Sequence, residues 1–158
     1  MPQLREDRRP GFTFVLEAIV TVADPVMIGQ ASDGAYRVVP ITGGTFAGPG
    51  IRGDVLPGGA DWQHIRPDGV AEIEARYLLE TDEGIRISVV NKGYRHGPKE
   101  VMDRLAAGKA VRPGEYYFRA VPIFQTPTGK HDWLSQTVCV ASGERYPDRV
   151  VIRVWAMR

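Results

Sequence analysis

The sequence predicts an all-β protein built as a single antiparallel β-barrel, and three observations lead to that prediction. The apolar runs are short and are interrupted repeatedly by Gly, Pro, Asp and Asn, which is typical of strands joined by turns. Two of these breaks, "PDG" at 67–69 and "DEG" at 82–84, are tight-turn signals between neighbouring strands. Closure removes exposed strand edges, so a barrel of about 8–10 strands is favoured over a two-sheet sandwich.

The expected elements follow in chain order. Strand character is found in residues 12–22, 35–44, 45–56, 60–66, 69–81, 84–93, 114–126, 133–142 and 149–157. One short helix is expected near 98–107, because Pro98 suits a first turn, Val101 and Leu105 share a face, and Gly108 lies just past the end. We therefore expect a flexible N-terminal tail over 1–11 and one barrel domain over 12–158.

Composition argues against several classes of partner. The chain has 158 residues, of which 43% are hydrophobic and 25% charged, and its formal net charge is +1. This near-neutral charge removes the electrostatic case for binding nucleic acid or an anionic membrane surface. No run approaches the roughly 18 apolar residues of a membrane span, and the first residues lack the apolar core of a signal peptide. We expect a soluble, cytoplasmic protein whose single cysteine, Cys139 in "TVCVA", is a buried strand thiol.

Motifs for cofactor chemistry do not occur in the sequence. His64, His96 and His131 show no ligand spacing such as H-x-H or HExxH. The glycine-rich stretch "GGTFAGPG" (43–50) is not a GxGxxG motif that opens a helix, and there is no G-x-S-x-G elbow. We therefore expect no metal and no organic cofactor, with a small molecule as the principal partner. The sequence does not decide whether the protein forms a homodimer.

Strand alternation yields candidates for the barrel lumen. Along 69–81, Tyr77 shares one face with apolar residues, and Glu74 and Arg76 share the other. Asn91 and Gln125 each end a largely apolar row, which is the pattern of a lumen with a few polar groups.

Arg119 is an anomaly in "YYFRAVPIF", which is otherwise apolar or aromatic. An arginine buried there needs a carboxylate, several carbonyls or an anionic ligand. One alternative is a salt bridge from Arg119 to Glu74 or Asp61 across the barrel. Another is that its guanidinium holds a substrate carboxylate or enolate. The remaining alternative is a surface arginine on the opposite face of its strand.

The stretch "GGADWQ" (58–63) places an acid beside an aromatic residue after a Gly-Gly turn. In one interpretation, Asp61 binds turn amides. In the other, it projects into the cavity mouth beside Trp62, where lost hydration raises its pKa and suits it to proton transfer near neutral pH.

Several blocks resemble a known family. "ITGGTFAGPGIRGDVLPGGADWQ", "EARYLLETDEGIRISVVNKGYRHGP", "YYFRAVPIFQT" and "WLSQTVCVASGERYPDRVVIRV" are similar to the bacterial and fungal family called domain of unknown function 3237, in order over roughly residues 12–157. The resemblance implies an antiparallel barrel, similar to lipocalin-like or allene-oxide-cyclase-like barrels, with no general biochemical role. The residues that match the family pattern are Gly58, Gly59, Asp61, Trp62, Arg76, Tyr77, Asn91, Arg95, Arg119 and Trp133.

The chain departs from this family pattern at two positions. Gln125 stands where relatives usually carry Glu, and Ser135 stands where they usually carry Asn. The missing carboxylate at 125 removes one proton acceptor or one partner for Arg119.

The sequence thus predicts a small-molecule-binding barrel, and a cofactor-independent isomerase, cyclase or lyase that acts on an oxygenated, partly apolar metabolite. A non-catalytic carrier and a self-associating structural protein are the alternatives. Asp61 would move a proton and Arg119 would anchor an oxygen anion. The residues expected to bind the substrate are Trp62, Glu74, Arg76, Tyr77, Asn91, Gln125, Trp133 and Ser135.

Overall fold

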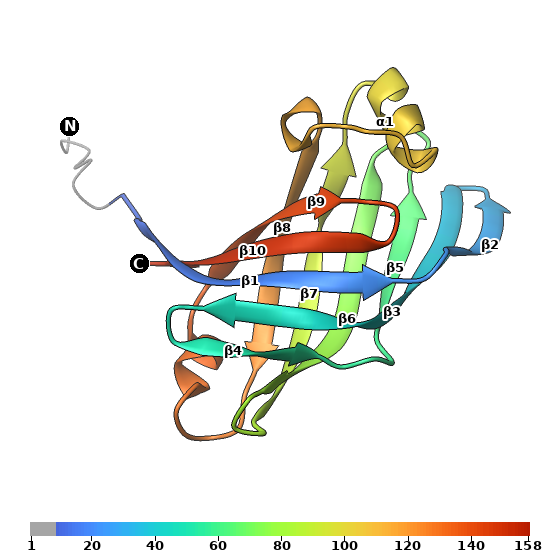
Figure 1. Cartoon of the computed structure of the whole chain (residues 1–158). Coiled ribbons are helices and arrows are strands. Elements are labelled where there is room, and N and C mark those ends of the chain that lie inside the picture. The colour runs from blue at the N-terminus through green and yellow to red at the C-terminus, as the bar shows by residue number, and fades with distance from the viewer. Residues whose placement is uncertain (1–8) are drawn as a thin grey trace, which may run out of the picture.

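Antiparallel strands wrap the chain into a closed β-barrel, which Figure 1 shows from the side. The structure is a computed structural model and describes residues 9–158. Residues 1–8 of the predicted N-terminal tail lie outside the described residues. The last residue of that tail, Gly11, exchanges backbone hydrogen bonds with Arg158, at 2.9 and 2.8 Å.

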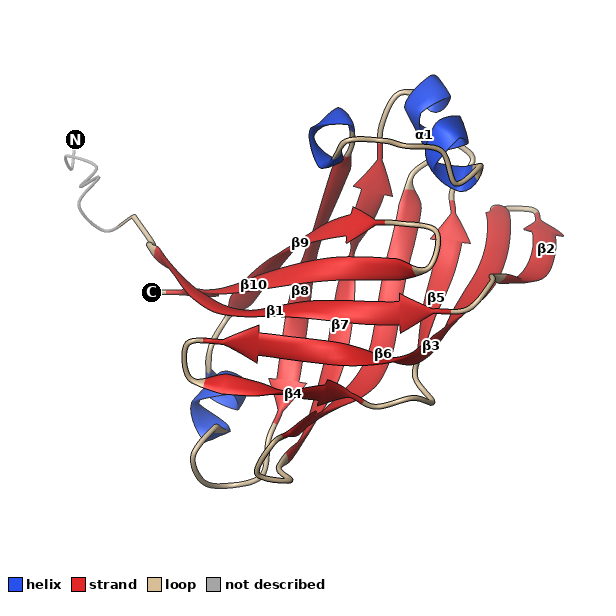
Figure 2. Cartoon of the chain, viewed as in Figure 1, coloured by secondary structure: helices blue, strands red, loops and turns tan. Residues whose placement is uncertain are grey.

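Strands make up most of the described chain, and the helices are short (Figure 2). The strands are β1 (Phe12–Val22), β2 (Val26–Ala31), β3 (Gly34–Gly48), β4 (Ile51–Val55), β5 (Ala60–Ile65), β6 (Ala71–Thr81), β7 (Arg86–His96), β8 (Tyr117–Gln125), β9 (Cys139–Arg145) and β10 (Arg149–Met157). The helices are α1 (Lys99–Ala106), η2 (Pro113–Glu115) and η3 (Asp132–Gln136). None of the helices in residues 9–158 has the length and apolar character that a membrane crossing needs.

The barrel closes because β1 pairs with strands from both ends of the sheet. It pairs with β10 on one side and with the second half of β3 on the other. From β10 the order runs through β9, β8, β7 and β6, and β4 and β5 together fill the place between β6 and β3. The result is the predicted closed antiparallel barrel, with eight strand positions around it. Strand β2 pairs only with β3 and lies beside the barrel.

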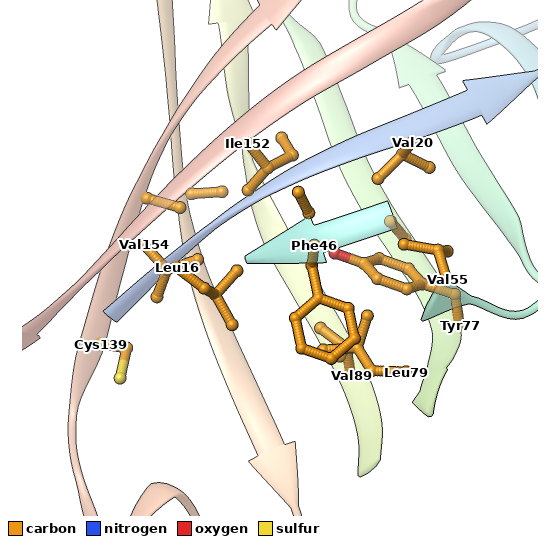
Figure 3. Packing of buried hydrophobic residues seen from close by; sticks show 14 of the residues in the cluster. Leu16, Val20, Phe46, Val55, Tyr77, Leu79, Val89, Cys139, Ile152 and Val154 are labelled. Atoms are coloured by element: carbon orange, nitrogen blue, oxygen red, sulfur yellow. The ribbon is translucent and has the colours of Figure 1, made fainter. Parts of the chain in front are cut away.

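Apolar side chains fill a large part of the interior (Figure 3). Leu16, Phe46, Leu79 and Val89 pack there from four different strands, each at 3% exposure or less. Cys139 is buried in the same cluster and forms no disulfide, which confirms the prediction for this thiol. Burial of this apolar surface is the main source of the barrel's stability.

Several element boundaries differ from the predicted ones. Strand β2 was not predicted, and β3 runs past the predicted boundary at 44/45 to Gly48, so that the predicted strand 45–56 is divided between the end of β3 and β4. The start of the predicted strand 133–142 is instead the helix η3. The predicted helix is confirmed as α1, which buries Val101 and Leu105.

Candidate functional site

The barrel interior is not completely filled. A cavity of about 40 Å³, measured as the space open to the centres of water molecules, lies between β1, β3, β5, β6, β7, β8, β9 and β10. Much of its wall is apolar, and its polar side chains are Asp61, Gln63, Tyr77, Asn91, Arg95, Arg145 and Tyr146. This mixture of an apolar wall and a few polar groups is typical of small-molecule sites. We call this space the lumen cavity.

The stretch "GGADWQ" brings Asp61 into the lumen cavity. Gly58 has φ of +104°, a backbone conformation that side chains disfavour, and this reverses the chain before β5. A Cβ on Gly59 would come within 2.4 Å of the Arg76 carbonyl oxygen, so only glycine lets β5 approach β6 there. Within β5, Asp61 lies opposite Val39 and Ala75. Asp61 therefore belongs to a strand and not to the turn.

Two hydrogen bonds in series hold the Asp61 carboxylate. Arg37 Nε donates to Gln63 Oε1 at 2.7 Å, and Gln63 Nε2 donates to Asp61 Oδ2 at 2.7 Å. Because Arg37 occupies the amide oxygen, the amide nitrogen must face the carboxylate. This leaves Asp61 Oδ1 as the oxygen without a partner.

Three buried side-chain atoms in the described residues have no hydrogen-bond partner: Asp61 Oδ1, Asn91 Oδ1 and Arg95 Nε. All three residues line the lumen cavity. Buried polar atoms in folded proteins are nearly always paired, and an unpaired one costs about 1–3 kcal/mol. The concentration of such atoms at one place makes the lumen cavity the candidate functional site.

Burial perturbs the ionisation of the same groups. Desolvation raises the pKa of Asp61, although the hydrogen bond from Gln63 and the charge of Arg95 oppose this. Burial, and then repulsion from Arg145 and Arg37, lowers the pKa of Arg95 to about 9, so that this guanidinium is still charged at neutral pH. Burial also lowers the pKa of Arg37 and of Arg145. One buried guanidinium, Arg95, and two half-buried ones, Arg37 and Arg145, therefore lie near one carboxyl group.

Tyr77 supplies a hydroxyl group to the same cavity. Burial, and then the charge of Asp61, raises the pKa of its phenol. The phenol is thus protonated at neutral pH and is able to donate a hydrogen bond. No group of three or more His, Cys, Asp or Glu side chains suited to a metal ion occurs in residues 9–158.

Arg119 and Gln125 do not face the lumen. Both are exposed on the outer side of β8, whose inward row is Phe118, Ala120 and Phe124. The guanidinium of Arg119 donates to the Phe118 carbonyl oxygen at 2.9 Å. This corrects the expectation that Arg119 anchors a ligand beside Asp61, and the alternative of a surface arginine is the right one.

Glu74, Arg76 and Trp62 also lie on the outer surface. Glu74 forms ion pairs with Arg76 at 3.0 Å and with Lys92 at 3.6 Å. The side chain of Trp62 is 54% exposed. Tyr77 and Asn91 do line the cavity with Asp61, so the structure brings together three of the ten predicted site residues.

Trp133 and Ser135 lie at the other end of the molecule, in η3. Figure 1 shows this orange helix at the end of the barrel opposite α1. Trp133 packs against the core, and the Ser135 hydroxyl donates to the Asp132 carbonyl oxygen at 2.7 Å. Neither side chain lines the lumen cavity, so the structure does not bring these two residues together with Asp61.

The predicted site residues did not include Gln63, Arg95, Arg145 or Arg37, although the family resemblance had marked Arg95. Strand alternation contains the signal for two of them, because Gln63 has the parity of Asp61 and Arg95 has the parity of Asn91. The predicted strand stopped at residue 93, so that Arg95 was not placed on the inward row. Arg37 and Arg145 are on strands that reach the cavity only through long-range pairing, and no local pattern marks them.

Fold and site together define the class of this protein as a closed antiparallel β-barrel whose apolar core contains a small cavity with a few polar side chains. The chain belongs to the DUF3237 family: the sequence model of this family, described as a protein of unknown function, matches residues 10–157. The resemblance noted in the sequence is thereby confirmed.

Relatives match over most of their length. A UPF0311 protein from Rhodopseudomonas palustris strain CGA009 is 43% identical over 141 residues, which is 89% of this chain and 92% of the relative. The crystal structure of a conserved protein of unknown function from Rhodopseudomonas palustris superposes with a TM-score of 0.93 at 40% identity, over 95% of this chain and 99% of that chain.

A more distant structure shares only the fold. It is described as an enzyme from Penicillium herquei and superposes with a TM-score of 0.72 at 21% identity, over 94% of this chain and 95% of that chain.

Proposed function

We propose that the lumen cavity binds a small oxygenated metabolite with an anionic group, and that Asp61 transfers a proton to or from it. The three unpartnered atoms Asp61 Oδ1, Asn91 Oδ1 and Arg95 Nε carry this proposal. Arg95 Nε requires an acceptor, such as a carboxylate or carbonyl oxygen. The two free oxygens require donors, such as a hydroxyl group or an acidic C–H. A hydroxy acid or keto acid meets both needs.

Charge supports an anionic ligand. Arg95 is buried and Arg37 and Arg145 are half-buried near one carboxyl group, and charges removed from water are costly unless they are paired. A bound carboxylate would offset some of this excess. The small cavity volume of about 40 Å³ favours a slender ligand.

The proton-transfer step balances without a cofactor. The Asp61 carboxylate takes a proton from the carbon next to the ligand's carbonyl group, and the C–H electron pair moves into the carbonyl to give an enolate. The Arg95 guanidinium stabilises the enolate oxygen, and the phenol of Tyr77 is a further donor in the same wall. In a ligand with a C=C bond between its β- and γ-carbons, the enolate charge extends to the γ-carbon. Return of the proton to that carbon shifts the double bond and completes an isomerisation. A raised pKa suits a carboxyl group to this role.

The alternative is a carrier in which the same residues bind and do not react. The enzyme from Penicillium herquei shows only that the fold is compatible with catalysis. Self-association is a separate prediction, which the molar mass in solution tests.

Hydrogen exchange in D₂O separates enzyme from carrier before the natural substrate is known. Small keto acids that shift the melting temperature are incubated with the protein, and deuterium incorporation next to the carbonyl is followed by NMR. For an enzyme, Asp61→Asn keeps binding and loses exchange by about a hundredfold or more, and Arg95→Met loses both. Binding with no exchange above the buffer rate supports the carrier, and absence of binding contradicts the proposal.

A further inference from the structure

A second cavity lies directly outside the lumen. Its volume is about 590 Å³, and it is lined by the end of α1 with the loop that follows, over residues 104–112, by Glu115, and by the β9–β10 turn, over residues 145–147. We call it the vestibule. Arg145 and Tyr146 line both the vestibule and the lumen cavity. These two side chains therefore lie at the boundary where the two spaces adjoin.

The vestibule has more positive charge than its own carboxylate neutralises. Glu115 is its single acidic lining residue in the described chain. Its carboxylate accepts a hydrogen bond from Arg104 Nη2 at 2.8 Å and another from the Arg112 backbone N–H at 2.7 Å. Within residues 9–158, the side chains of Lys109, Arg112 and Arg145 form no ion pair.

The dipole of α1 explains only some of this charge. Arg104 lies in the last turn of the helix and Lys109 lies shortly after its end, where the partial negative charge of the last carbonyls favours cations. Arg112 lies beyond the helix, and Arg145 belongs to β9. The dipole falls off within the last turn, so it does not account for these two arginines.

We propose that the ligand has two anionic groups, the first held in the lumen by Arg95 and the second held in the vestibule by Arg112 and Lys109. This inference rests on the proposed function and names its ligand class, a slender dianion such as a dicarboxylate. Arg145 lies between the two groups and contributes to both. The narrow lumen admits one end of the molecule, and the wider vestibule accommodates the other.

Calorimetric titration of matched ligands tests this inference. The probes are the α,ω-dicarboxylates from succinate to suberate, each compared with the monocarboxylate of equal chain length. For the wild type we expect one chain length at which the diacid binds about tenfold tighter than its monoacid, as one charge-assisted contact would provide. The double variant Lys109→Gln/Arg112→Gln is expected to lose this advantage and to keep the affinity for the monoacid.

Arg119→Gln is the matched control, since it removes one exposed positive charge from β8, outside both cavities. It should keep the diacid advantage. If monoacid binding depends on Arg95 but no diacid binds more tightly than its monoacid at any chain length, the inference of a dianionic ligand is overturned. The proposed function then still stands. An equal loss in the control also overturns the inference of a dianionic ligand, because general charge would then explain the effect. If no acid binds at all, both proposals are overturned.

Discussion

Gln63 donates its amide N–H to Asp61 Oδ2 at 2.7 Å and thereby determines which carboxylate oxygen is free. The orientation of the amide is itself fixed by Arg37, which donates to Gln63 Oε1 at 2.7 Å. In the proposed reaction, Oδ1 is therefore the oxygen that would accept or give a proton. Gln63 acts on the site only through Asp61, and is thus a positioning residue.

Replacement of Gln63 tests this arrangement. Gln63→Met keeps the length of the side chain and leaves both Asp61 Oδ2 and Arg37 Nε without their partner. We expect the free energy of unfolding to fall by about 1–3 kcal/mol, the usual cost of buried unpaired polar groups, as measured by urea denaturation. Gln125→Met is the control, since Gln125 is exposed on β8, and it should stay within about 0.5 kcal/mol of wild type. Equal stability of the two variants would contradict a structural role for the Gln63 amide.

The raised pKa of Asp61 makes stability depend on pH in a defined direction. Burial raises this pKa above its ordinary value of 3.8, so the folded protein keeps the proton to a higher pH than the unfolded chain. Between these two pKa values the folded state binds more protons, and its stability falls as pH rises. Asp61→Asn does not titrate at this position. Its stability relative to wild type should therefore rise from about pH 4 and level off above the folded pKa.

Urea denaturation of both proteins at several pH values measures this difference. Glu83→Gln is a suitable control, because Glu83 lies in the β6–β7 turn and is about half exposed. If the wild type instead gains stability over Asp61→Asn with rising pH, attraction to the arginines outweighs burial, and the assigned direction is wrong.

The structure and the sequence prediction point to different arginines as the residue that holds the ligand's carboxylate: Arg95 in the structure and Arg119 in the sequence prediction. Arg95→Met removes the guanidinium whose Nε has no partner in the lumen, and we expect carboxylate affinity to fall by about tenfold or more. Arg119→Met changes an exposed residue on β8 and should alter affinity by less than about twofold. Calorimetric titration with the tightest monocarboxylate measures both. The reverse ranking would mean that the ligand binds outside the barrel.

Local sequence patterns predicted the fold and the inward position of Asp61. The positions of the other site residues depend on long-range strand pairing. The turn signals and the α1 pattern were sufficient for a barrel with one helix. Side-chain parity failed on β8 because both of its faces are apolar: Phe118 and Phe124 point inward, and Val121 and Ile123 point outward. With two apolar rows, alternation alone does not say which row faces the core.

The basic side chains of the site show the same limit. Arg37 reaches Gln63 because β3 pairs with β5 in a register that places the two residues opposite each other. Arg145 is at the end of β9, whose place in the barrel depends on pairing with β10. Such registers are set by the closed sheet as a whole, and single-strand patterns do not contain them.

The close approach of β5 to β6 at Gly59 sets the position of Asp61, and a single methyl group tests it. In Gly59→Ala the new Cβ would lie 2.4 Å from the Arg76 carbonyl oxygen and 2.6 Å from Tyr77 Cβ, so β5 must move away from β6. We expect a loss of about 1–3 kcal/mol in unfolding free energy, together with weaker carboxylate binding, because Asp61 and Tyr77 move apart.

Gly58→Ala is the matched control: φ of +104° makes alanine strained there, but no atom lies within 4 Å of its Cβ. It should lose about 1–2 kcal/mol and keep carboxylate affinity, since β5 stays in place. Urea denaturation and calorimetric titration of both variants provide the comparison, and unchanged affinity in a folded Gly59→Ala protein would show that the spacing of β5 and β6 does not position the site.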